Sequence, residues 1–252
     1  MSSASRGARI TWNVIRGLFY AVIFSVIALL FWRIASSGDP KSVKALTIND
    51  ALAEAYERDG EDLYMFRQNQ RSITSGEHNY GYFSITDCVF IPAANQVQIV
   101  LRYNNSTLRS LAKDYNLSAV PSRDEELFDV SLVFAIDETP ENKNDNLWDE
   151  KKYDPNAVSM TRVHPESVSK DEKQMYNYRR FVFDLGSAGL SLSELTEEEL
   201  MLAVFVDIYY NEDIRYEEAA YGTPCLYTYL DKTLTVELSS DDKRALDAYK
   251  GQ

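Results

Sequence analysis

The residue types that most often carry out catalysis are scarce in this chain of 252 residues. It contains two histidines, His78 and His164, and two cysteines, Cys88 and Cys225. Two histidines supply few general bases, and the chain lacks the Gly-x-Ser-x-Gly turn that exposes a serine nucleophile. The histidines match no His-Glu-x-x-His motif and the cysteines no paired spacing, which argues against a closed zinc site. The sequence therefore predicts no catalytic residue, no bound metal and no cofactor.

Two acidic stretches offer carboxylates to a metal or to acid–base chemistry. Residues 142–150 supply the oxygen ligands that calcium prefers. An EF-hand register that begins at Asn142, however, places Leu147 where glycine is needed and Tyr153 where a bidentate glutamate is needed. The run Glu197–Glu199 is typical of the first turn of a helix, where negative charge complements the dipole. A calcium site outside the EF-hand pattern and a carboxylate acid–base pair stay open as alternatives.

Tyrosine is unusually abundant, with 17 copies. Its large contact area and polar tip suit both binding interfaces and the outer faces of sheets. The segment around residues 209–221 therefore predicts a binding surface for a basic protein segment or a glycan. This surface comprises Tyr209, Tyr210, Tyr216, Glu217, Glu218 and Tyr221. Cross-strand packing of the same tyrosines is the alternative interpretation.

An uncharged apolar run, Gly17–Trp32, precedes all of these residues. As a helix it spans about 24 Å, and arginines at its ends can raise their guanidinium groups to the headgroups of a hydrocarbon slab about 30 Å thick. Two tryptophans twenty residues apart are separated by about 30 Å on a helix, which places one indole at each interface. The run predicts a transmembrane helix over 12–35, with the lipid bilayer as its partner. Its predicted interfacial residues are Trp12, Arg16, Trp32 and Arg33.

A cleaved signal peptide is the alternative to a permanent anchor. Ala35-Ser36-Ser37 has the small-x-small pattern of a cleavage site, whereas the bulk and charge of Trp32-Arg33-Ile34 favour an uncleaved signal-anchor. Three arginines and no acid precede the run, which favours a cytoplasmic N terminus and an extracytoplasmic C-terminal domain. Three basic residues also follow the run closely, so a cytosolic domain is the alternative topology. The predicted location is the plasma membrane, as a single-pass protein.

The charge of the remaining chain limits its partners. Residues 1–35 contain four arginines and no acid, so 22 basic residues face 39 acidic ones beyond them, a formal net charge of −17. Such a domain repels nucleic acid and anionic lipid headgroups, and we expect neither as a ligand. Another envelope protein or a glycan is the expected partner.

The chain after the anchor predicts a connecting segment followed by one β domain. Residues 1–11 predict a short cytoplasmic tail, and residues 36–76 a juxtamembrane linker that contains an amphipathic helix at 47–58. Residues 77–252 predict an extracytoplasmic domain with a C-terminal helix at 240–249.

Alternation of apolar and polar residues with period two indicates the strands of this domain. Strands are predicted at 80–91, 97–103, 128–137, 175–185, 200–210, 225–230 and 233–238. A two-residue turn at Asp231-Lys232 is expected to join the last two as a hairpin. Helical turns are expected at 108–115, and a short edge strand at 158–163 within the long loop 138–173. The pattern predicts a mainly β fold, an antiparallel β-sandwich of immunoglobulin-like type with a few short peripheral helices.

Both cysteines fall in strand-like surroundings. In an extracytoplasmic domain Cys88 and Cys225 would be free to form a disulfide, and two buried thiols are the alternative. The expected function is a non-enzymatic binding or accessory module at the cell envelope. A membrane-tethered extracytoplasmic hydrolase that uses carboxylate acid–base chemistry is the alternative.

Overall fold

The computed structural model describes most of the chain. The described residues are 3–37, 41–68, 74–75, 84–114, 116–122, 128–136, 160–173, 176–196, 200–210, 214–215, 226–230 and 232–250. The chain forms two compact units. One consists of residues 1–39 with 173–175, and the other holds the remaining residues.

The first unit is dominated by one long helix, α1 (Ser3–Ser37). Its segment Trp12–Ala35 has 24 residues, and the most apolar 18-residue window of that segment has a mean hydropathy of 2.4 and contains no buried residue. At 1.5 Å per residue this segment is about 36 Å long. It is therefore long and apolar enough to cross a membrane. Arg16 donates hydrogen bonds to the Tyr20 hydroxyl at 3.1 and 3.2 Å, one turn further along the helix.

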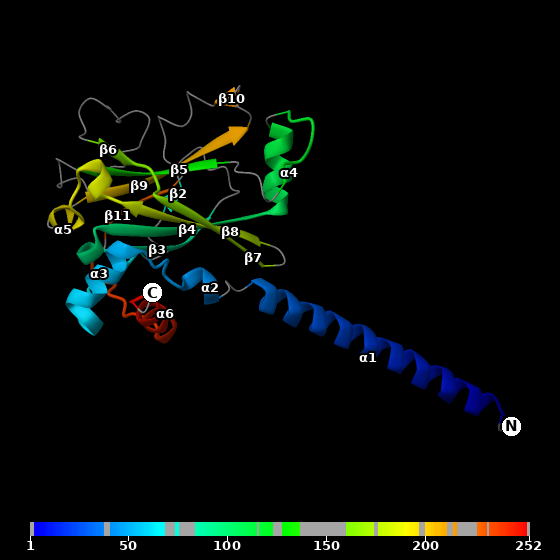
Figure 1. Cartoon of the computed structure of the whole chain (residues 1–252). Helices are drawn as coiled ribbons and strands as arrows, with labels where there is room; N and C mark the ends of the chain where they lie inside the picture. The colour runs from blue at the N-terminus through cyan, green and yellow to red at the C-terminus, as the bar shows by residue number, and fades with distance from the viewer. Residues whose placement is uncertain are drawn as a thin grey trace, which may run out of the picture. The chain divides into compact units, whose positions relative to one another are not determined.

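Two sheets form the framework of the second unit (Figure 1). The first is a five-stranded antiparallel sheet with the order β1-β3-β4-β8-β7. Its strands are β1 (Phe66–Arg67), β3 (Ser84–Ile91), β4 (Gln96–Asn104), β7 (Ser167–Lys173) and β8 (Tyr176–Asp184). The second has the order β2-β11-β9-β5-β6, with β10 paired to β9. Its strands are β2 (Thr74–Ser75), β5 (Phe128–Ile136), β6 (Met160–Val163), β9 (Leu200–Tyr210), β10 (Ile214–Arg215) and β11 (Leu226–Tyr229).

Side chains from both sheets meet in one hydrophobic core. Strands β4 and β8 contribute alternate residues, and β5 does the same from the other sheet. The fully or almost fully buried members are Val97, Ile99, Leu101, Phe181, Phe183, Val130, Leu132 and Phe134. This alternation is the period of two that a strand imposes on its side chains. The core therefore joins the five-stranded sheet to the six-stranded one.

A register shift in β3 changes which side chains enter this core. The pairing of β3 with β4 shifts between Ile85 and Asp87. Ile85 lies in the core before the shift, and Cys88 and Phe90 lie in it afterwards. A bulge inserts one residue into a strand, and so exchanges the two faces. Phe90 then stacks on Phe66, with ring centroids 4.8 Å apart.

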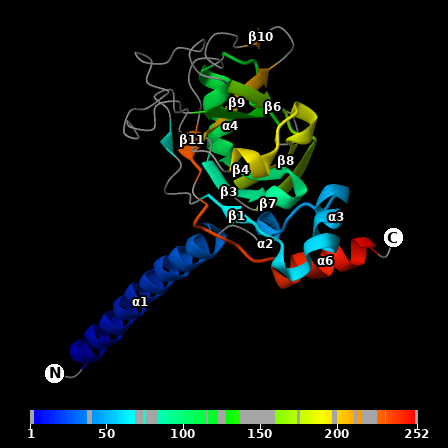
Figure 2. The ribbon, with the colours of Figure 1, turned by 90° about the vertical axis from the view of Figure 1, so that its left-hand side faces the viewer.

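Helices cover the other face of the five-stranded sheet (Figure 2). Helices α3 (Asp50–Asp59) and α6 (Ser240–Lys250) pack there against Val89 and Ile91 of β3. Asn49 caps α3 by accepting a hydrogen bond from the Leu52 amide at 3.1 Å. The other short helices in the described residues are α2 (Lys41–Lys44), η1 (Gly60–Asp62), η2 (Pro92–Ala94), α4 (Asn105–Asp114), η4 (Gly186–Ala188) and α5 (Leu192–Leu195). Both faces of β3 and β4 are consequently covered, one by helices and one by the second sheet.

The structure contains the apolar N-terminal helix, the antiparallel sheet and the short helices that the sequence predicts. Most predicted strands are found within a few residues of their expected bounds. The prediction of a strand over 233–238 is wrong, because this segment contributes only an isolated bridge between Thr235 and Phe66. It lies along β1, where the backbone amide of Arg67 donates to the Leu234 carbonyl at 2.9 Å, so the expected hairpin with β11 does not form. Strand β7 lies inside the predicted long loop 138–173, where the sequence did not predict a strand at these residues.

Candidate functional site

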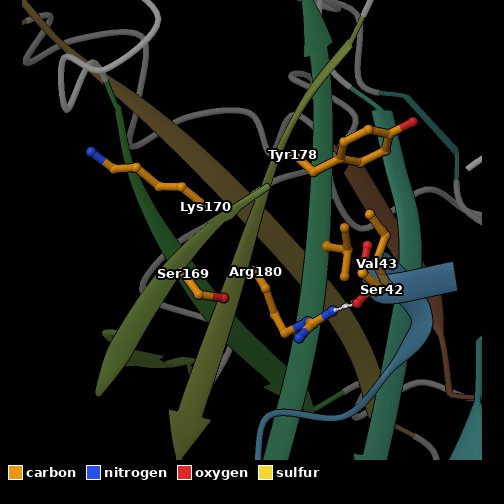
Figure 3. Close-up of a pocket in the computed structure, with 7 residues that line it drawn as sticks. Ser42, Val43, Ser169, Lys170, Tyr178 and Arg180 are labelled. Carbon is orange, nitrogen blue, oxygen red and sulfur yellow. Dashed lines mark hydrogen bonds between the residues drawn. The ribbon is translucent and has the colours of Figure 1, made fainter. Parts of the chain in front are cut away.

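A pocket of about 200 Å³ lies where α2 meets the five-stranded sheet (Figure 3). Its lining residues come from α2, β4, β7 and β8. They are Ser42, Val43, Val100, Ser169, Lys170, Tyr178 and Arg180. Val43, Val100 and Tyr178 form a small buried apolar cluster. The other four lining side chains are polar or positively charged, and none of the seven is acidic.

Arg180 fixes α2 to the sheet. Its guanidinium donates to the backbone carbonyls of Ser42 at 2.5 Å and Val43 at 2.8 Å. It also donates to the Thr47 hydroxyl at 3.4 Å. Figure 3 shows the first of these bonds, with Arg180 reaching from β8 to α2 and Lys170 pointing away from them. Charge-assisted hydrogen bonds are stronger than neutral ones, so α2 is held firmly at the pocket wall.

The segment after α2 is fastened to the same sheet face by a buried glutamine. The Gln98 side-chain oxygen accepts from the Thr47 amide at 2.8 Å, and its nitrogen donates to the Thr47 carbonyl at 2.9 Å. Gln98 is 3% exposed, so these bonds satisfy a side chain that burial would otherwise penalise. The Leu46 amide donates to the Asp242 carboxylate of α6 at 2.7 Å. The segment that contains Leu46 and Thr47 therefore packs as part of the β domain.

A buried ion pair lies nearby on β3 and β1. The Arg67 guanidinium is 2.6 Å from the Asp87 carboxylate, and the Asp87 side chain is 7% exposed. Burial raises the pKa of Asp87, and the positive charges of Arg67, Lys44 and Arg180 oppose that shift. Such a pair compensates a buried carboxylate that would otherwise be costly. Asp87 does not line the pocket.

The predicted interfacial residues all lie on α1. The side chains of Trp12 and Trp32 are 66% and 56% exposed, and Arg16 and Arg33 are also exposed. Their relation to a bilayer stays a prediction.

The predicted tyrosine surface lies mostly outside the described residues. Tyr209 and Tyr210 belong to the end of β9, where they pair in register with Arg215 and Ile214 of β10. The remaining members, Tyr216, Glu217, Glu218 and Tyr221, fall outside the described residues. The surface therefore stays a prediction.

Cys88 lies in the core of the β domain. It is 1% exposed, and burial raises the pKa of its thiol. Its proposed disulfide partner, Cys225, falls outside the described residues, so the disulfide stays a prediction.

The described part of the chain contains no group of three or more histidine, cysteine or carboxylate side chains that could hold a metal ion. His164 is exposed, and His78 falls outside the described residues. The acidic stretch 142–150 and the run 197–199 also fall outside them.

Sequence reasoning missed the pocket because its residues are spread over the chain. Ser42 and Arg180 are 138 positions apart and meet only after α2 packs on the sheet. The one available signal was Arg180 itself, a charge within the alternating segment that forms β8.

No family model matches the chain, and neither a curated protein nor a solved structure is similar to it.

Proposed function

We propose that this chain is a single-pass membrane protein whose C-terminal β domain lies outside the cytoplasm and acts by binding. The proposal rests on the exposure of the largely apolar segment Trp12–Ala35, whose 24 residues are all exposed. An exposed apolar surface of this kind is unfavourable in water. A length of about 36 Å exceeds the hydrocarbon thickness of about 30 Å, so a lipid bilayer would bury the apolar part of the segment.

The charge pattern supports an N terminus in the cytoplasm. Arg6, Arg9 and Arg16 precede the apolar run, and no acidic residue accompanies them. Positively charged residues near a span favour the cytoplasmic side. Acidic residues begin only at Asp39, beyond the span. This orientation places the β domain in the extracytoplasmic space.

We also propose that the β domain is an immunoglobulin-like sandwich, and the strand order supports this. With β3, β4, β7 and β8 as strands A, B, D and E, the first sheet reads A-B-E-D. With β5, β6, β9 and β11 as C, C′, F and G, the second reads G-F-C-C′. These are the orders of immunoglobulin domains. Strand β5 has no tryptophan, the hallmark of strand C in antibody domains, so the likeness concerns architecture.

Binding is favoured over hydrolysis by the chemistry of the pocket. Its polar lining consists of hydroxyl, ammonium and guanidinium groups, which donate hydrogen bonds. A hydrolase of the carboxylate type needs two acidic side chains that converge on one site. The buried carboxylate of Asp87 is instead paired with Arg67. The function of such a module is to hold a partner in the envelope. Proximity labelling can identify that partner.

Proximity labelling in intact cells tests this proposal. A peroxidase is fused after Gln252 of the full chain, and the control carries the same peroxidase directly after residues 1–40. We expect the full chain to label a reproducible set of envelope proteins that the control does not label. Identical labelling by both chains would show that the β domain selects no partner. Labelling of cytosolic proteins by both would contradict the proposed orientation.

A further inference from the structure

We infer that the pocket between α2 and the five-stranded sheet binds a phosphate group. The polar side chains of its lining are the hydroxyls of Ser42 and Ser169 and the cationic groups of Lys170 and Arg180, whereas Tyr178 belongs to the apolar cluster. Phosphate oxygens accept hydrogen bonds from such donors and are attracted by both charges. A pocket that carries two positive charges and no acid matches an anion.

The local charge of the pocket differs from that of the domain. The chain beyond residue 35 has a net charge of −17, which predicts repulsion of anions at long range. At physiological ionic strength, charges further away than about 8 Å are largely screened. The groups nearest the ligand then decide the sign of the interaction. Asp87, an acid that interacts with Arg180, is compensated by Arg67 at 2.6 Å.

The pocket is built to hold a small group. Its volume of about 200 Å³ lies below the range of about 300 to 1,000 Å³ typical of drug-sized ligands. The bonds of Arg180 to the Ser42 and Val43 carbonyls fix its charge in place before any ligand arrives. Lys170 extends from β7 at the rim, where its ammonium group points away from Arg180 and would have to turn on its flexible stem to reach a ligand. The pocket therefore has one charge that is fixed in place and a second at its rim.

The phosphate can come from solution or from a lipid headgroup. Residues 36–40 connect Ala35, the end of the proposed membrane span, to Lys41 of α2, and the six Cα–Cα steps between them extend at most about 22 Å. The lipid source alone rests on the membrane anchoring proposed above. The free anion requires no membrane.

The test uses the full chain in lipid nanodiscs and measures the melting temperature Tm. In phosphatidylcholine discs, inorganic phosphate is titrated against chloride at constant ionic strength. In a second arm, discs of equal parts phosphatidylcholine and phosphatidylglycerol are used without phosphate. A ligand that binds only the folded state raises Tm. We expect a rise in the first arm if the site takes the free anion, and in the second if it takes a lipid headgroup.

Two variants assign the effect to the pocket. Lys170→Glu replaces an exposed cation at the rim, and we expect about tenfold weaker apparent binding in the arm that responds. Lys113→Glu makes the same charge change on α4 and should respond as the wild type does. The inference would be overturned if Tm rose in neither arm. It would also be overturned if Lys170→Glu and Lys113→Glu weakened the apparent binding equally. Failure of the chain to enter the discs would instead contradict the proposed anchoring. The effect of inorganic phosphate on Tm can then be measured with the chain in detergent-free solution.

Discussion

Arginine at both Val22 and Val26 will release the chain from membranes. The two valines lie in the middle of Trp12–Ala35, and their side chains are 61% and 50% exposed. Each arginine at the centre of a membrane-spanning helix costs about 2.5 to 3.5 kcal/mol of insertion free energy. Two of them cost about 5 to 7 kcal/mol, which lowers the equilibrium constant of insertion on the order of ten-thousandfold. The measurement is the share of the chain that stays with the membrane pellet after extraction with alkaline carbonate.

The matched control keeps the substitution sites and changes only the chemistry. Val22→Leu combined with Val26→Leu preserves the apolar surface, and this variant should stay in the pellet as the wild type does. Retention of the arginine variant in the pellet would show that α1 is not what holds the chain to membranes. Release of the wild type itself would contradict anchoring.

Truncation of core side chains from either sheet will strongly destabilise the whole β domain. Phe90 of the five-stranded sheet is fully buried and stacks on Phe66, and Leu132 of the six-stranded sheet is also fully buried. We expect Phe90→Ala to lower the free energy of unfolding by about 3 to 5 kcal/mol and Leu132→Ala by about 2 to 5 kcal/mol. Domains of this size are stable by only about 5 to 15 kcal/mol, so both losses are large. Urea denaturation of the full chain in mild detergent measures them.

A surface truncation provides the comparison. Val168 on β7 is 49% exposed, and Val168→Ala should change the free energy of unfolding by less than about 0.5 kcal/mol. Because Phe90 and Leu132 belong to one core, each variant should unfold in a single transition monitored by all probes. Separate transitions for the two sheets would contradict a shared core.

Strong alternation of apolar and polar residues made several strands predictable. The strands at Gln96–Asn104 and Phe128–Ile136 lie within a residue or so of their expected bounds. The face that β3 buries was not predictable, because the register shift between Ile85 and Asp87 exchanges inward and outward residues. A bulge depends on pairing with a neighbouring strand, which a local pattern does not contain.

Contacts between distant segments explain the predictions that failed. Residues 233–238 have the composition of a strand, but the partner available to them is the short β1, with which only Thr235 forms a bridge. Strand β7 reads SVSKDEK, and its charges hide the strand pattern because it lies at a sheet edge, where charged side chains are common. The pocket was equally hidden, since Ser42 and Arg180 meet only through tertiary packing. Of the predicted site residues, the exposed positions on α1 are described in full, whereas most of the tyrosine surface falls outside the described residues.

Thiol labelling determines directly on which side of the membrane the β domain lies. In a Cys225→Ser background, Ala248→Cys places a thiol at an exposed position of α6, and Ser5→Cys places one in the predicted cytoplasmic tail. Cys88 should not be labelled in either variant, because it is buried and its raised pKa disfavours the reactive thiolate. With a membrane-impermeant maleimide, we expect Ala248→Cys to be labelled in intact cells and Ser5→Cys only after lysis. Labelling of Ser5→Cys in intact cells, with Ala248→Cys labelled only after lysis, would contradict the proposed orientation.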